Sequence, residues 1–157
     1  MTWKDAPIDG CPITPLMKYA DGRGWLSEFF RKDELAPARH PVMGYISLTH
    51  PGVARGPHEH RDQTDLFVFF NGTFRLYLWD MRRHSPTFGH RQVMDLGETA
   101  PAVAIVPPGV VHAYRNVGEH GAVIINCPNR LYAGEGKQEP VDEIRHEDRA
   151  ESVFVMD

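Results

Sequence analysis

The stretch GPHEHRDQTDLFVFFNG, residues 56–72, places two histidines one residue apart ahead of an acid, an apolar run and an Asn-Gly pair. Side chains alternate across a strand, so His58 and His60 are expected to face the same way, with Glu59 opposite. Asp65 opens the apolar run that follows. The stretch therefore indicates either a metal site or a catalytic base that lies beside an unrelated histidine.

The sequence around this stretch predicts an all-β fold. Thirteen prolines and fourteen glycines interrupt the chain, and long helical periodicity is missing. Short strand-like runs recur instead, at 43–50, 65–70, 73–79, 103–106, 111–114 and 122–126. Many short strands at close spacing favour an antiparallel sandwich or barrel. Asn71-Gly72, between two of these runs, predicts a β-hairpin.

Length and composition limit the classes of protein that need to be considered. The 157 residues suit one domain, 1–157, with a core at about 21–133 and a charged C-terminal arm at about 134–157 that is irregular or holds a short helix. A net charge of −4 gives no electrostatic argument for nucleic acid or an anionic membrane as a partner. Two cysteines make no disulfide framework, and no stretch resembles a signal peptide or a membrane span, which predicts a cytoplasmic location.

The spacing of the histidines continues into a second motif. The first motif reads Gly52-x5-His58-x-His60-x4-Asp65-x6-Gly72, and the second reads Pro107-x-Gly109-x2-His112-x3-Asn116. Both are similar to the two motifs of the cupin superfamily, although Asp65 stands where that pattern usually has Glu. The resemblance implies a jelly-roll β-barrel.

In metal-binding cupins the matching residues hold a divalent ion, which here would be His58, His60, Asp65 and His112. Three imidazoles and a carboxylate suit Fe, Mn, Zn, Ni or Cu and leave positions open for a substrate. A lone histidine in a β protein is more often a surface or hydrogen-bonded residue, and a barrel can keep the motif without the ion. Both alternatives stay open at this point.

Four blocks, in the right order, resemble the dTDP-4-dehydrorhamnose 3,5-epimerase family, which is itself a cupin fold. They are DGRGWLSE (21–28), GVARGPH (52–58), DMRRHSPTFG (80–89) and VPPGVVHAY (106–114), against the family's D-x-R-G-x-F-x-E, G-V-L-R-G-L-H, D-x-R-x-x-S-P-T-F-G and I-P-x-G-F-x-H-G-F. The resemblance covers about 21–148. It implies an epimerase or keto-isomerase for a 4-keto-6-deoxyhexose on a nucleoside diphosphate, with no cofactor required and a homodimeric assembly.

The resemblance also implies the two residues that move protons. His58 matches the family's base, which removes a proton next to the 4-keto group. Such a proton is weakly acidic, so the site needs a base that titrates near neutrality, and histidine supplies it. Tyr132 matches the tyrosine acid on the opposite face of the sugar, with its register shifted by about one residue from the family's pattern.

Five further residues are expected to bind the substrate. Arg55 matches an arginine that faces the sugar-phosphate portion, and His112 matches the pocket histidine of the P-x-G-x-x-H block. Arg23 and Glu28 match positions that contact the nucleotide from the partner subunit of the dimer. Tyr114 shares a strand face with His112 and is therefore expected to line the same pocket.

This chain departs from the epimerase pattern at positions that bear on the chemistry. His60 stands where the family has glutamine, and Asp65 stands near the position of a lysine that would help to hold the oxyanion. Both changes introduce metal ligands, and a divalent ion could stabilise the enolate instead of the lysine. A metal-bound His58, however, has no free lone pair with which to act as a base. The family's C-terminal L-S-x-K-D block, whose aspartate orients the base, has no match.

Three hypotheses follow from the sequence. The first is the nucleotide-sugar epimerase or keto-isomerase. The second is a metal-dependent cupin enzyme (an isomerase, lyase or oxygenase) that acts on a small polar substrate. The third is a sugar-binding cupin without catalytic activity, which the missing C-terminal aspartate favours. The four-block match is more specific than the general cupin spacing and favours the first hypothesis.

Overall fold

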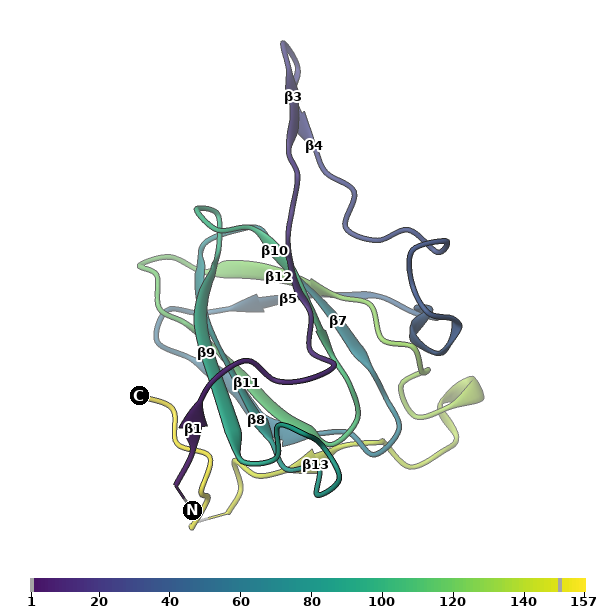
Figure 1. Ribbon diagram of the computed structural model, residues 1–157. Helices are drawn as coiled ribbons and strands as arrows, with labels where there is room; N and C mark the ends of the chain where they lie inside the picture. The colour runs from purple at the N-terminus through teal and green to yellow at the C-terminus, as the bar shows by residue number, and fades with distance from the viewer. Residues whose placement is uncertain (1, 150) are drawn as a thin grey trace.

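The computed structural model describes residues 2–149 and 151–157, and these form a single all-β unit of two facing sheets (Figure 1). The six-stranded sheet runs in the order β1 (Lys4–Asp5), β9 (His90–Gly97), β8 (Thr73–Asp80), β11 (Val110–Asn116), β6 (Ala54–Glu59) and β13 (Ile144–Arg145). The five-stranded sheet runs in the order β2 (Ile13–Pro15), β10 (Ala102–Val106), β7 (Asp65–Phe69), β12 (Ala122–Asn126) and β5 (Tyr45–Thr49). The predicted all-β class is confirmed.

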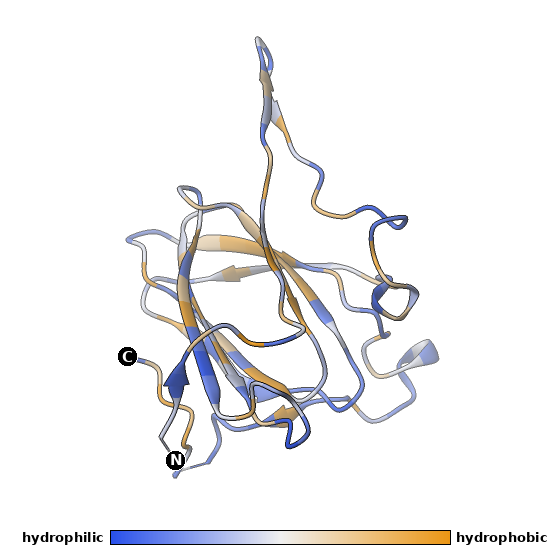
Figure 2. Cartoon of the chain, viewed as in Figure 1, coloured by the Kyte–Doolittle hydropathy of each residue, from blue (hydrophilic) through white to orange (hydrophobic). Residues whose placement is uncertain are grey.

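The core lies between the two sheets and is rich in aromatic side chains. Phe67 and Phe69 point inward from β7, and Phe74 points inward from the facing strand β8. Their rings pack edge to face around Tyr114, which is 3% exposed. Burying such a side chain contributes about 1.5–3 kcal/mol, so this cluster holds the sheets together. Figure 2 shows the hydrophobic residues gathered on the strands and the hydrophilic ones mainly on the loops.

All six predicted runs are strands, namely β5, β7, β8, β10, β11 and β12. The structure adds β6, which carries the histidine motif, and β9, an eight-residue strand that the predicted runs did not include. The sheets also take in β1, β2 and β13, which lie outside the predicted core. The domain boundaries proposed from the sequence stay a prediction.

The hairpin predicted at Asn71-Gly72 is wrong. β7 and β8 belong to different sheets, and this turn leads the chain from one sheet to the other. Gly72 has φ +62°, and a Cβ at this position would collide with the Cβ of Ala122. The Asn71 Oδ1 accepts a hydrogen bond of 3.1 Å from the backbone N–H of Val123. The pair therefore makes a tight corner against β12 instead of a hairpin turn.

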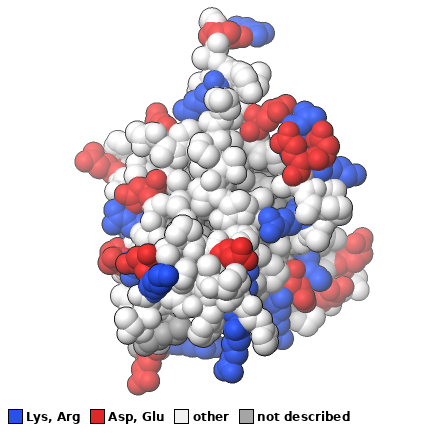
Figure 3. All heavy atoms as spheres, in the orientation of Figure 1, with Lys and Arg blue, Asp and Glu red and all other residues white. Residues whose placement is uncertain are grey.

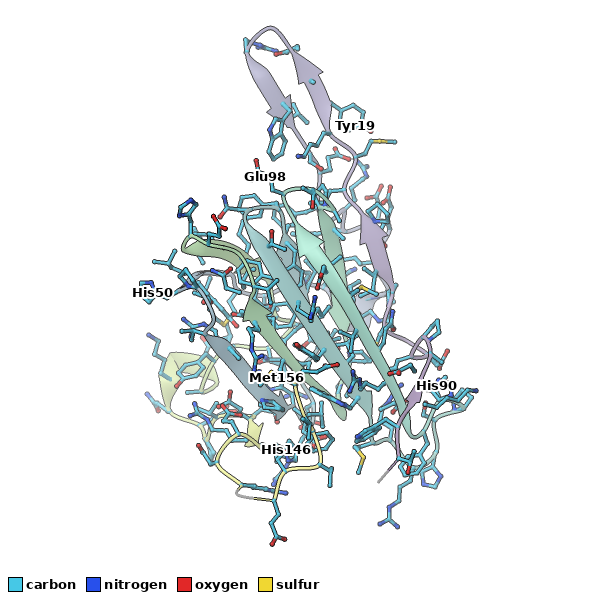
Figure 4. The ribbon with its side chains drawn as sticks, turned by 90° about the vertical axis from the view of Figure 1, so that its left-hand side faces the viewer. Tyr19, His50, His90, Glu98, His146 and Met156 are labelled. Carbon is cyan, nitrogen blue, oxygen red and sulfur yellow. The ribbon has the colours of Figure 1, made fainter. Side chains whose placement is uncertain are left out.

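The C-terminal segment packs along the outer face of the six-stranded sheet, where Figure 4 labels His146 and Met156. The segment first forms η2 (Glu135–Lys137), a 3₁₀ helix of one turn. β13 then pairs with β6 at the edge of the sheet. Phe154 lies 5.6 Å from Trp79, measured between ring centroids, and is 7% exposed. Trp3 donates a hydrogen bond of 3.1 Å to the Val153 carbonyl. These contacts hold the C-terminal segment in place. The part of this segment that precedes Phe154 forms one wall of the site described below.

A two-stranded hairpin, β3 (Tyr19–Asp21) and β4 (Gly24–Leu26), projects away from the barrel (Figure 1). A further 3₁₀ turn, η1 (Pro37–Arg39), lies in the loop between β4 and β5. In Figure 3 the projection ends in charged side chains, and acidic and basic groups are interspersed over the rest of the visible face. Within 2–149 and 151–157, no helix is long and apolar enough to cross a bilayer.

Candidate active site

The pairing of β6 with β11 brings two of the predicted site residues together. His58 lies directly opposite His112 in the antiparallel register, and their ring centroids are 4.4 Å apart. Gly56, with φ +82°, allows this close approach, because a Cβ there would lie 2.5 Å from the His112 carbonyl oxygen and 3.1 Å from the His58 Nδ1. A register shift on β11 separates His112 from Tyr114. The glycine is therefore part of the construction of the site.

Asp65, at the start of β7, is 1% exposed and reaches across to two histidines from the facing sheet. Its Oδ2 lies 3.0 Å from the Nε2 of His60 and 3.3 Å from the Nε2 of His112. Its Oδ1 accepts hydrogen bonds of 2.9 Å from the side-chain amides of Gln63 and Asn126. The motif residues that lie far apart in the sequence thus meet at one buried point.

Electrostatics at this point favour a carboxylate and an unprotonated base. Burial lowers the pKa of His58 to about 2, and the imidazoles of His112 and His60 add to the effect. Burial alone would raise the pKa of Asp65, but its contacts with His112 and His60 outweigh burial and hold this pKa below the usual range. Burial would likewise lower the pKa of His60, but Asp65 outweighs burial and raises it. At neutral pH His58 is therefore unprotonated, but its lowered pKa also makes it a weaker base than the near-neutral base expected from the sequence.

Glu143 is a site residue that the sequence reasoning missed. Its Oε1 lies 3.8 Å from the Nδ1 of His58, and its Oε2 lies 2.8 Å from the Nε of Arg145. The register of β13 on β6, in which Arg145 lies opposite His58, brings the carboxylate there. The absence of the L-S-x-K-D block therefore does not leave the base without an acidic neighbour. The run VDEIR (141–145) gave no strand signal, because its apolar and polar residues do not alternate.

A cavity of about 1130 Å³ opens onto this cluster. His58 and His60 line it together with Arg55, Tyr114 and Tyr132, which were predicted from the sequence. Arg55 is held by hydrogen bonds from its Nε to the Thr49 hydroxyl and from its Nη2 to the Leu48 carbonyl, at 3.2 and 3.0 Å. Tyr132 is 57% exposed, so its hydroxyl lies in a more open part of the cavity than the histidines.

Two predicted nucleotide-binding residues do not line this cavity. Arg23 lies on the projecting hairpin, where it pairs with Asp21 at 2.5 Å and its side chain is 90% exposed. Glu28 lines a separate groove of about 460 Å³, beside Phe29 and Phe30. The structure of one chain therefore brings Arg55, His112, Tyr114, Tyr132 and the motif residues together but leaves Arg23 and Glu28 apart from them.

The three imidazoles of His58, His60 and His112 offer nitrogen atoms that all lie within 4.8 Å of one another. Groups at such spacing can share a proton or bind a common cation. The site thus combines an unprotonated base with a cluster of imidazoles of the kind that bind metal ions. Its cavity can admit a polar ligand the size of a sugar nucleotide.

Comparison with known proteins identifies relatives over most of the chain. A family profile described as dTDP-4-dehydrorhamnose 3,5-epimerase matches residues 5–150. The spore coat polysaccharide biosynthesis protein SpsL of Bacillus subtilis is 38% identical over 125 residues, which cover 80% of this chain and 82% of the relative. The probable low-salt glycan biosynthesis epimerase Agl13 of Haloferax volcanii is 35% identical over 133 residues, or 84% and 85% of the two chains.

Solved structures share the fold. A dTDP sugar isomerase from Desulfovibrio desulfuricans superimposes with a TM-score of 0.80 at 21% identity, covering 95% of this chain and 91% of the other. A Legionella pneumophila dTDP-6-deoxy-D-glucose-3,5-epimerase, solved with dTDP-4-keto-L-rhamnose, gives 0.75 at 23% identity, covering 90% and 74%. These structures confirm the predicted cupin jelly roll.

Proposed function

The chain belongs to the dTDP-4-dehydrorhamnose 3,5-epimerase family, and on that premise we propose that it inverts a carbon next to the ketone of a 4-keto-6-deoxyhexose on a nucleoside diphosphate, with His58 as the base. It is a sugar-nucleotide epimerase, and the family requires no cofactor. The observation that carries the assignment of the base is the position of His58, which faces the cavity between His112 and Glu143.

The environment of His58 supports this role. A general base must be unprotonated and oriented toward the substrate, and its neighbours bear on both conditions. Burial among other imidazoles disfavours the charged form of His58. Glu143, itself fixed by Arg145, faces Nδ1, so Nε2 is the nitrogen available to a substrate. This is the arrangement in which a carboxylate orients a histidine and stabilises the imidazolium as it forms.

Inversion also requires an acid on the other face of the sugar, and we assign this role to Tyr132. Its position in the lining of the cavity supports the assignment, as does its exposure of 57%. Arg55 and Tyr114 then line the pocket around the sugar and its first phosphate, whereas His112, predicted to bind substrate, is 1% exposed and lies beside His58 without lining the cavity. The hypothesis of a sugar-binding protein without catalytic activity was favoured by the missing C-terminal aspartate. Glu143 supplies a carboxylate near His58 and so removes that argument.

We further propose a homodimer in which the β3–β4 hairpin covers the pocket of the partner. An isolated two-stranded hairpin is at best marginally stable in water, and this one exposes large apolar side chains, namely Met17 (69%), Tyr19 (60%), Trp25 (51%) and Leu26 (61%). A second copy of the chain would bury them and would bring Arg23 and Glu28 to a nucleotide. The cytoplasmic location stays a prediction.

Product analysis tests the catalytic assignment. With a nucleoside-diphospho-4-keto-6-deoxyglucose as substrate, the native protein should form an epimer that chromatography and NMR resolve. His58→Asn should lower the rate about 10²–10⁴-fold, which is the usual contribution of a general base. His50→Asn, at an exposed histidine outside the cavity, is the matched control and should retain full activity. No epimer from the native protein with any nucleotide of this class, or an active His58→Asn variant, would contradict the proposal.

A further inference from the structure

We propose that His60, His112 and Asp65 together bind a divalent transition-metal ion at the floor of the cavity, beside His58. The proposal rests on the function above and adds to it a site that the epimerase family does not require. It is carried by the positions of three donor atoms, one from each residue.

The first observation is that two of these atoms are buried without a hydrogen-bond partner. Among the described residues, Oδ2 of Asp65 and Nε2 of His112 each lack one, although they lie only 3.3 Å apart. Both side chains are 1% exposed. Such unpartnered polar atoms are costly, and a cation between them would satisfy both.

The second observation is that both histidines use Nδ1 elsewhere. Nδ1 of His60 contacts the backbone carbonyl of Asp142, and Nδ1 of His112 lies 3.2 Å from the carbonyl of Val110. A carbonyl only accepts, so each Nδ1 carries the proton and each Nε2 keeps its lone pair, which in His60 also lies 3.3 Å from the side-chain amide nitrogen of Gln63. Metal-ligating histidines in proteins show this same pattern, in which the other ring nitrogen donates to a carbonyl or carboxylate.

The third observation is the distance between the donors. Neighbouring ligands of an ion bound at about 2.1 Å lie about 3.0 Å apart in octahedral and about 3.4 Å apart in tetrahedral geometry. The two Nε2 atoms lie 3.0 and 3.3 Å from the Asp65 Oδ2. In the described part of the chain, His58 makes no approach of 4.0 Å or less to that carboxylate, and its Nδ1 faces Glu143. A nitrogen of His58 also lies within 4.8 Å of those of His60 and His112, but its Nδ1 faces Glu143, and we assign His58 as the base instead of a further ligand.

The surroundings hold the donor set in place. Asp142 accepts backbone hydrogen bonds from Arg61, Asp62 and Gln63 through its carboxylate, at 2.8–2.9 Å, while its carbonyl holds His60. Two imidazoles and a carboxylate on one side of an ion suit Mn, Fe, Ni, Cu or Zn and leave coordination positions facing the cavity. An ion there would supply positive charge near the sugar oxygen, the role the family's lysine would have.

Metal content is the direct test. Protein without a histidine tag, expressed in medium supplemented with Mn, Fe, Ni, Cu and Zn salts, should carry close to one equivalent of a divalent metal by plasma mass spectrometry. After chelation, Co²⁺ added to the apoprotein should produce a stoichiometric visible absorption band. Less than about a tenth of an equivalent, together with no Co²⁺ band, would overturn the proposal, because donors so arranged bind these ions tightly.

Variants separate this site from the catalytic assignment. His60→Gln places the family's own residue at this position, so folding is preserved, and it should weaken Co²⁺ binding at least tenfold, as should Asp65→Asn. His58→Asn should bind Co²⁺ like the native protein while losing epimerisation, and His50→Gln should change neither. A His60→Gln variant with native Co²⁺ affinity, or a His58→Asn variant that loses the ion, would refute the three-residue assignment. Native protein that epimerises the substrate but carries no metal and binds no Co²⁺ would refute the site and leave the function intact.

Discussion

Glu143, a single carboxylate on the C-terminal segment, lies 3.8 Å from the Nδ1 of His58 and is proposed to orient it. The sequence motifs predicted His58, His112, His60 and Asp65 as a group, because a strand alternates its side chains and the spacing of the turns was recognisable. Glu143 was not predicted, since it reaches His58 only through the pairing of β13 with β6, two elements far apart in the chain. Long-range pairing of a two-residue strand leaves almost no local signal.

Replacing this carboxylate should impair catalysis without unfolding the protein. Glu143→Gln removes the charge that favours the imidazolium form of His58, so we expect kcat to fall about tenfold or more while KM changes little. Steady-state kinetics measure the effects on kcat and on KM separately. Glu147→Gln, on the same segment and also at the cavity, serves as the control, because among residues 2–149 and 151–157 the Glu147 carboxylate forms no ion pair with a histidine. A Glu143→Gln variant with native kcat would show that His58 needs no carboxylate.

At the scale of elements, the corner at Asn71-Gly72 shows where local sequence rules fail. An Asn-Gly pair between two strand-like runs favours a hairpin on local grounds. The aromatic residues of β7 and β8 instead face each other across the core, which requires the strands to lie in different sheets. Burial of these side chains outweighs the modest preference of the turn.

The corner can be tested by adding one methyl group. Gly72→Ala combines a left-handed backbone with a collision against Ala122, and we expect it to lower the free energy of unfolding by about 1–3 kcal/mol. Gly22→Ala, at an open position with nothing within 4 Å, should be neutral. Urea denaturation of both variants measures the difference. Equal midpoints would contradict the packed corner.

The loop after β8 is fixed by one buried acid. Asp80 is 0% exposed and accepts hydrogen bonds from Arg82, Ser85 and Thr87. Burial would raise the pKa of Asp80, but these bonds outweigh burial and lower it. The four-block resemblance included this loop, and the structure gives the reason for its residue types.

Asp80→Asn should therefore destabilise the protein in a pH-dependent way. Because the folded-state pKa is depressed, the stabilisation is complete above the unfolded value of about 3.9 and is lost as pH falls through the folded-state pKa. We expect a loss of about 1.5–3 kcal/mol at pH 7. The gap to the native protein should narrow as the pH drops toward 3. Urea titrations at several pH values would contradict this if the gap stayed constant.

At the scale of the whole molecule, the projecting hairpin exposes large apolar side chains that one chain alone does not bury. The barrel was predictable because its strands are short, apolar and regularly separated by turns. The placement of the hairpin was not, because Tyr19, Trp25 and Leu26 stay largely exposed within one chain and only the proposed dimer would bury them. Arg23 and Glu28 are the residues whose proposed role depends on that dimer.

Light scattering after gel filtration should give twice the mass of one chain. Trp25→Asp with Leu26→Asp should produce a monomer that is folded but has lost most of its activity, because the partner no longer contributes to the pocket. Val155→Asp, at a residue that is 63% exposed on the C-terminal segment, should remain dimeric and active. A native protein with the mass of one chain would contradict the proposed homodimer.

The central claim is that this cavity exchanges a proton on the carbon next to a sugar ketone. Incubating the protein with a nucleoside-diphospho-4-keto-6-deoxyglucose in D₂O tests it most directly, with deuterium at C3 and C5 followed by NMR. The account predicts deuterium at one or both carbons with the native protein, and a rate about 10²–10⁴-fold lower with His58→Asn. Retention of hydrogen at both carbons with the native protein would contradict it.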